Sequence, residues 1–147
     1  MIAPRLVRLI ETHSEQLARG LMERLQHCEK CPDVQRIPAD EFRQRAFEVY
    51  GQLGDWLMTK SEAELERRCM AIGARRAAQG IPLSQVIWAI LLTKEHLWEF
   101  LKREALVDRP VEVLQELDLL LVIEYFFDRA TYYAALGYER AQAARAA

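Results

Sequence analysis

Apolar residues recur at helical spacing along most of this chain. Between residues 4 and 29 they return every three or four positions, which places them on one face of a helix. A second helix is predicted from Asp40, a residue type that favours the N-cap. Its apolar stripe runs to Leu57 with the 3.6-residue period of an amphipathic helix. No segment shows the alternating pattern of a half-buried strand.

Turn signals predict where the next helices begin and end. Ser61 and Glu64 have the spacing of a capping box, in which each side chain bonds to a backbone N–H group of the first turn. A third helix is therefore expected from Ser61 to a stop at Gly80, because glycine accepts the left-handed conformation that ends many helices. A fourth helix is expected over residues 82–105.

The fifth predicted helix begins near Pro110 and continues past Tyr138. From residue 117 to residue 127 it is apolar almost all round, so we expect it to be buried on two sides, the second by another chain. The chain is therefore expected to form a homodimer. The predicted interface residues are Leu119, Leu120, Val122, Ile123, Phe126 and Phe127.

These elements together predict a single all-α domain over residues 1–147. Its five helices fit an antiparallel bundle with a long C-terminal helix. The 147 residues are 51% hydrophobic and 29% charged, which is a globular balance. The formal net charge of −2 argues against nucleic-acid binding, because nucleic-acid binders usually carry a basic patch.

The most apolar stretch, residues 117–127, is too short for a membrane span, which needs about 20 apolar residues. The first ten residues include no long apolar core, so we expect no secretory signal and no membrane association. We therefore expect a cytoplasmic protein, whose three cysteines are reduced.

His27, Cys28 and Cys31 form the most suggestive cluster for metal binding. Two cysteines separated by two residues are half of a common zinc site. A closed site needs four ligands, and no second pair follows, so these residues are weak candidates and we expect no metal. Serine-nucleophile motifs and phosphate-binding glycine loops are also absent, so we expect neither an enzyme nor a cofactor.

A bound small molecule or haem is the alternative function. His96, near the apolar face of the fourth helix, is the best single candidate for a ligand-binding residue, and His13 is a second. Trp56, Tyr50 and Trp88 could line a ligand cavity with His96. Aromatic residues at helical spacing are more often ordinary core residues.

Residues 75–89 carry a resemblance to a known family. A helix that ends in Arg76-Ala77-Ala78-Gln79-Gly80, then Ile81-Pro82-Leu83, then an apolar helix, resembles the N-terminal sensory domain of RsbR-type regulators. These regulators are co-antagonists of the bacterial stressosome. The helix that contains Trp56 and the late position of Trp98 are also similar, and the likeness spans about residues 5–140.

The resemblance implies a globin-like helical dimer that lacks haem and has no catalytic residues. Such domains pass a stress signal through the C-terminal helix to a signalling output domain or a protein partner. We therefore interpret the chain as a non-catalytic sensory domain that acts by shifts of helix packing at a dimer interface. Gly51, Gly54 and Gly73 are the points at which we expect helices to slide.

Overall fold

Five α-helices and one 3-10 turn make up residues 3–59, 61–104 and 110–146, which are the residues that the computed structural model describes. Side chains are described from residue 8 and, in the last helix, from residue 120. No strand occurs in these ranges, so the predicted all-α class with a long C-terminal helix is confirmed. The elements are α1 (Ala3–Gln26), η1 (Val34–Arg36), α2 (Ala39–Thr59), α3 (Glu62–Ala78), α4 (Leu83–Glu104) and α5 (Pro110–Ala146).

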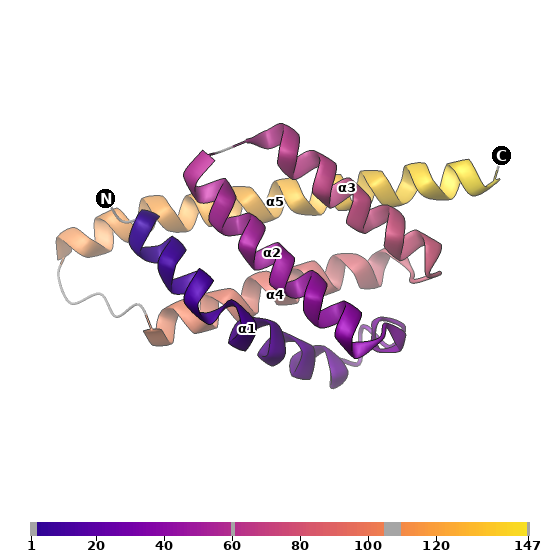
Figure 1. The fold of residues 1–147 in the computed structure, drawn as a ribbon, viewed down its shortest axis with the longest axis horizontal. Coiled ribbons are helices and arrows are strands. Elements are labelled where there is room, and N and C mark those ends of the chain that lie inside the picture. Colours follow the sequence, from indigo (N-terminus) through magenta and orange to yellow (C-terminus); the bar gives the residue numbers. More distant parts are fainter. Residues whose placement is uncertain (1–2, 60, 105–109, 147) are drawn as a thin grey trace.

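Helix α5 follows the long axis of the molecule, and its C-terminus extends beyond the other helices (Figure 1). Helix α4 lies beside α5 and runs in the opposite direction, and α1, α2 and α3 cross one side of this pair (Figure 1). The most extensive contacts join α3 to α5 and α1 to α2, whereas α2 and α3 touch at few positions. The fold therefore contains two closely packed helix pairs, with a looser boundary between α2 and α3, and α4 contacts both pairs.

Helices α3 and α5 approach each other so closely that two glycines are required. A Cβ atom at Gly73 would collide with the carbonyl oxygen of Ala134, and one at Gly137 would collide with the carbonyl oxygen of Met70. The phenol of Tyr138 adds a buried hydrogen bond of 2.5 Å to the Ile81 carbonyl. The two helices are therefore joined by direct contact between their backbones, as well as by side-chain packing.

The glycines predicted as sliding points have different environments. Gly73 lies at the tight α3–α5 crossing, but a Cβ at Gly51 would meet nothing within 4 Å, so Gly51 permits no close approach. Gly54 is buried. Two glycines with tight surroundings were not predicted: Gly137 and Gly20, where a Cβ would lie 2.8 Å from two atoms of the His96 ring.

One predicted helix start differs from the observed one, and at another the predicted capping bonds are not formed. The amide of Phe42 donates to the Pro38 carbonyl at 3.0 Å, so α2 begins at Ala39 and Asp40 lies in its first turn instead of at the N-cap. Ser61 does occupy the N-cap of α3, but its side chain makes no capping hydrogen bond. The predicted capping box is wrong because Glu64 turns to two arginines of its own helix, Arg67 and Arg68.

The helix stops are closer to the sequence prediction. Helix α1 ends at Gln26, three residues before the predicted end. Gly80 has a φ of +71°, which confirms the left-handed stop predicted after α3. The predicted break at residues 107–109 lies outside the described residues.

Candidate functional site

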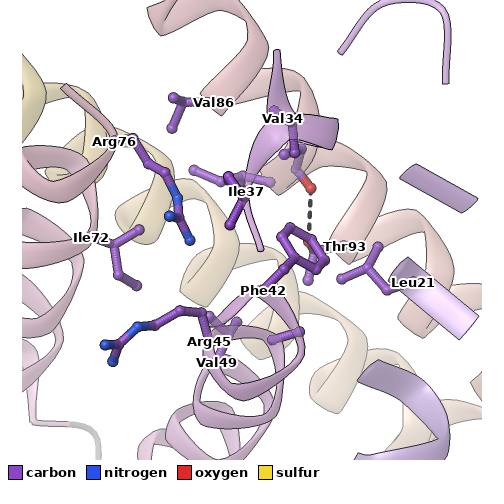
Figure 2. Close-up of a pocket in the computed structure, with 13 residues that line it drawn as sticks. Leu21, Val34, Ile37, Phe42, Arg45, Val49, Ile72, Arg76, Val86 and Thr93 are labelled. Carbon is purple, nitrogen blue, oxygen red and sulfur yellow. Dashed lines mark hydrogen bonds between the residues drawn. The ribbon is translucent and has the colours of Figure 1, made fainter. Parts of the chain in front are cut away.

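A cavity of about 80 Å³ lies where η1 meets α1, α2, α3 and α4 (Figure 2). We call it the central cavity. Its wall is apolar apart from two arginines and one threonine. It is lined by Leu21, Val34, Ile37, Phe42, Arg45, Ala46, Val49, Ile72, Arg76, Val86, Ala89, Ile90 and Thr93.

Helical spacing explains why these residues face one space. Helix α2 contributes Phe42, Arg45 and Val49, which are three and four positions apart and so share one face. Helix α4 contributes Ala89 and Thr93 at the same spacing. The Thr93 hydroxyl donates to the Ala89 carbonyl at 2.7 Å (Figure 2), so its hydrogen is bonded within the helix and the α4 wall is effectively apolar.

Arg76 occupies the α3 side of the central cavity and is only 7% exposed. Its Nη1 donates to Gln79 at 2.7 Å and to the Glu41 carboxylate at 3.3 Å, which ties the end of α3 to the start of α2. Burial lowers the pKa of Arg76, and the bond to Glu41 opposes this effect. The charge of Arg76 is thus compensated by Glu41, within the chain.

A second apolar cavity, of about 60 Å³, lies deeper, between α2, α3, α4 and α5. We call it the deep cavity. It is lined by Val49, Gln52, Cys69, Ile72, Ile90, Thr93, Phe126, Phe127, Ala130 and Ala134. Four of these residues also line the central cavity, so the two spaces are separated by side chains such as Val49 and Ile72.

An open groove between α2 and α3 lies next to these cavities at the surface. We call it the arginine groove, and its volume is about 370 Å³. It is lined by Arg45, Glu48, Val49, Gln52, Arg67, Arg68, Ala71, Ile72 and Arg75. Val49 and Ile72 line the groove and both cavities. Figure 2 shows the guanidinium group of Arg45 pointing away from the centre of the central cavity.

Two residues of the groove each carry a buried donor that has no hydrogen-bond partner among the described residues. The two donors are Nε of Arg45 and Nε2 of Gln52. The residue Gln52 is only 5% exposed. A buried polar group without a partner costs about 1–3 kcal/mol. These donors therefore mark a place where an external acceptor would be stabilising.

The outer face of α5 is the second candidate functional surface. Leu121 is 68% exposed and Tyr132 is 60% exposed, and Tyr125 lies between them on the same face. We call these three residues the α5 stripe. The guanidinium carbon of Arg129 lies 3.8 Å from the centre of the Tyr125 ring, and Trp56 stacks on Tyr125 at 5.7 Å.

The predicted dimer interface needs correction. Ile123, Phe126 and Phe127 are buried in the chain's own core, so they offer no surface to a second chain. Leu120 and Val122 are half-buried, and the side chain of Leu119 lies outside the described residues. The helix is apolar on both sides, as predicted, but the exposed side carries different residues.

The four predicted ligand-binding residues do not share a cavity. His96 packs against Gly20 of α1, where burial lowers its pKa. Tyr50 is fully buried, and Trp56 stacks on α5. The ring of Trp88 lies under Lys30, whose Nζ is 4.4 Å from the ring centre. None of the four lines the central cavity, the deep cavity or the arginine groove.

Of the predicted metal candidates, Cys28 and Cys31 lie next to each other, with a hydrogen bond between their side chains. His27 is exposed, Cys28 is half-buried and Cys31 is buried with its thiol 3.8 Å from the Gln85 carbonyl. Across residues 3–59, 61–104 and 110–146, no three histidine, cysteine or acidic side chains are grouped so that they could hold a metal ion.

Gln52 and Arg45 were missed by the sequence analysis, although a signal was present. Gln52 is a polar residue inside an apolar stripe, and Arg45, Val49 and Gln52 have i, i+4, i+7 spacing. The family-like segment, residues 75–89, was recognised, and it supplies Arg75 to the groove and Arg76, Val86 and Ala89 to the central cavity.

The chain matches a family model, the RsbT co-antagonist protein rsbRD N-terminal domain, over residues 11–147. It belongs to this family. RsbRD N-terminal domains are regulatory domains related to the stressosome, which confirms the resemblance seen in residues 75–89. No curated protein and no solved structure matches the chain. None of the described helices of this RsbRD domain is long and apolar enough to span a membrane.

Proposed function

We propose that this RsbRD N-terminal domain is a non-catalytic, cytoplasmic sensory domain that works as a homodimer. The dimer would form along the outer face of α5. A signal would change the packing of the helices and pass through α5 to an output domain or a protein partner. The family match supports the regulatory role.

The α5 stripe is the observation that carries the dimer proposal. Leu121, Tyr125 and Tyr132 lie on the side of α5 opposite Ile123 and Ala130, which face the core. Exposed apolar residues in a row on a long helix favour helix–helix association, because pairing removes them from water. Helix α5 has 37 residues and is about 55 Å long, so two copies could bury an extended interface.

The arrangement of helix pairs supports a route for the signal. Helix α3 is joined to α5 through Gly73 and Gly137, so the two helices should move together. Helices α2 and α3 touch at few positions, and the arginine groove lies between them. A change in the groove would therefore shift the α3–α5 pair relative to the α1–α2 pair, and packed helices shift between discrete arrangements.

Sedimentation of a charged variant tests the dimer. We expect the wild-type domain to sediment as a dimer at micromolar concentration. Leu121→Glu combined with Tyr132→Glu should give a monomer with unchanged helical content, because two carboxylates would have to be buried at the interface. Phe47→Glu is the matched control, because Phe47 is 50% exposed but lies on α2.

A wild-type domain that stays monomeric at high micromolar concentration would refute the dimer. A dimer that tolerates the α5 variant but dissociates with Phe47→Glu would move the interface to α2.

The cavities and the groove favour a second function, small-molecule sensing. The ligand would bind where the arginine groove adjoins the central and deep cavities.

A further inference from the structure

We propose that the arginine groove binds a small amphipathic anion, a carboxylate with an apolar tail of about six to eight carbons. The carboxylate would lie between Arg45, Gln52 and Arg75, and the tail would enter the central and deep cavities. The effect of this ligand on signalling rests on the proposed function. The binding of the ligand does not, and it is tested separately.

The unpaired donors argue for an acceptor at this place. Nε of Arg45 and Nε2 of Gln52 are both buried, and neither has a hydrogen-bond partner among the described residues. Both side chains line the arginine groove, on one face of α2. An ionised carboxylate only accepts hydrogen bonds, so it is the kind of group that these donors lack. Because both donors are buried, their side chains would have to turn towards the groove to reach it.

The charges around the groove argue for an anion. Arg45 donates to Glu48 through Nη1 at 2.9 Å, and Arg67 and Arg68 share the single carboxylate of Glu64. Within the described part of the chain, Arg75 makes no side-chain hydrogen bond or ion pair. Four arginines therefore face two glutamates, which leaves an excess of positive charge at the mouth of an apolar space.

The cavities limit the size of the tail. Their volumes are about 80 and 60 Å³. Together they approach the roughly 150 Å³ of an engineered apolar cavity that binds benzene, a six-carbon ring. The half-buried side chains of Val49 and Ile72 separate the cavities from each other and from the groove, so rotation of these two side chains would open one continuous path.

The same features argue against an inorganic anion as the intended ligand. Phosphate or sulfate would use the arginines but leave the adjoining apolar cavities empty. A neutral apolar molecule would fill the cavities but leave the donors of Arg45 and Gln52 unpaired. A medium-chain carboxylate would fill the apolar cavities and also supply an acceptor for the donors.

Titration with sodium octanoate, followed in ¹H–¹⁵N spectra, tests the proposal directly. The spectra report the side-chain NH₂ of Gln52 and the Nε–H of Arg45. Octanoate should shift both signals in a saturable manner. Sodium acetate, which lacks the tail, and octanol, which lacks the charge, should each bind at least tenfold more weakly.

Three variants and one control separate the charged end from the apolar end. Arg45→Met and Gln52→Leu each remove one donor and should weaken octanoate binding about tenfold or more. Arg43→Met is the matched control, because Arg43 is exposed on the same helix, pairs with Asp40 and lies outside the groove. It should bind octanoate as the wild type does. Ala89→Leu fills the central cavity and should also weaken binding.

Three results would overturn the proposal: no saturable shift with octanoate, equal affinity for acetate and octanoate, or equal losses in Arg45→Met and Arg43→Met. Sedimentation of the same samples keeps the two proposals apart. A dimer that ignores octanoate would refute the ligand and leave the α5 interface intact. A monomer that binds octanoate would refute the α5 interface and leave the ligand proposal intact.

Discussion

The hydroxyl of Tyr50 lies in the core without a hydrogen-bond partner among the described residues. Burial raises the pKa of Tyr50, because the charged phenolate is excluded from a dry site. Tyr138 is also buried, but its hydroxyl donates to the Ile81 carbonyl. A buried tyrosine hydroxyl should therefore destabilise the fold at Tyr50, where it has no partner, and stabilise it at Tyr138, where it is bonded.

Replacing each tyrosine by phenylalanine should reveal this difference. Tyr50→Phe should raise the free energy of unfolding by about 1 kcal/mol, because it removes an unpaired buried hydroxyl. Tyr138→Phe should lower it by about 1–2 kcal/mol, because it leaves the Ile81 carbonyl without its partner. Urea unfolding measures both. A loss of stability in Tyr50→Phe would mean that its hydroxyl has a partner, such as a buried water.

Two buried thiols should make stability depend on alkaline pH. Burial raises the pKa of Cys69 to about 12. Burial, and then the hydrogen bond and charge of Cys28, raise the pKa of Cys31 to about 12. The unfolded chain loses these protons above about pH 8.5, whereas the folded chain keeps them. Their contribution to stability is therefore full below that pH and is lost as the pH rises towards 12.

Between pH 9 and 10, the buried thiol of Cys69 should lower the free energy of unfolding by about 1.4 kcal/mol per pH unit. Cys69→Ser should reduce the measured slope by about that amount. Urea unfolding at several pH values gives the slope. An unchanged slope in Cys69→Ser would mean that this thiol titrates alike in the folded and unfolded chains.

At the scale of the helices, glycine has two different roles. At Gly73 the absence of a side chain lets α3 reach the backbone of α5, because a Cβ would collide with the Ala134 carbonyl. At Gly51 a Cβ would meet nothing within 4 Å, so glycine only weakens the helix there. Helical periodicity alone could not separate these roles.

A pair of alanine substitutions separates them. Gly51→Ala should raise the free energy of unfolding by up to about 1 kcal/mol, because alanine favours the helix. Gly73→Ala should lower it by about 2 kcal/mol or more, because the helices must move apart. Thermal unfolding followed by circular dichroism measures both changes. Equal effects of the two variants would contradict the close α3–α5 crossing.

At the scale of the whole molecule, the close contact between α3 and α5 makes them one structural unit. Gly73 and Gly137 mark two places where the backbones of the helices meet, and Tyr138 of α5 also bonds to Ile81, which follows α3 in the chain. The contact between α2 and α3 is slight in comparison. Local unfolding should therefore begin at the α2–α3 boundary before it separates α3 from α5.

Native-state hydrogen exchange tests this order. Backbone amides of residues 70–77 and 130–138 should exchange with the same free energy of opening, because neither helix can open without the other. Amides of α2 next to the arginine groove should open at a lower free energy. Residues 70–77 opening at clearly lower denaturant than residues 130–138 would show that the two helices do not form one unit.

Local sequence patterns were sufficient to predict the helical elements and one of the turns. Local periodicity and stop residues were enough to predict five helices and the left-handed conformation of Gly80. These features depend on residues within about four positions of one another, so they can be read along the chain. The family motif in residues 75–89 was visible for the same reason.

The tertiary structure alone decided which side of α5 is buried and where the cavities lie. An almost uniformly apolar helix has no single stripe to select its inner face, so Phe126 was predicted at an interface and lies in the core. Asp40 and Ser61 have cap-like identities, but the backbone of Pro38 and the arginines near Glu64 decided their bonding. The arginine groove combines α2 and α3, and its unpaired donors depend on how far apart these helices lie. That separation is set by packing between residues distant in the chain, which no local pattern records.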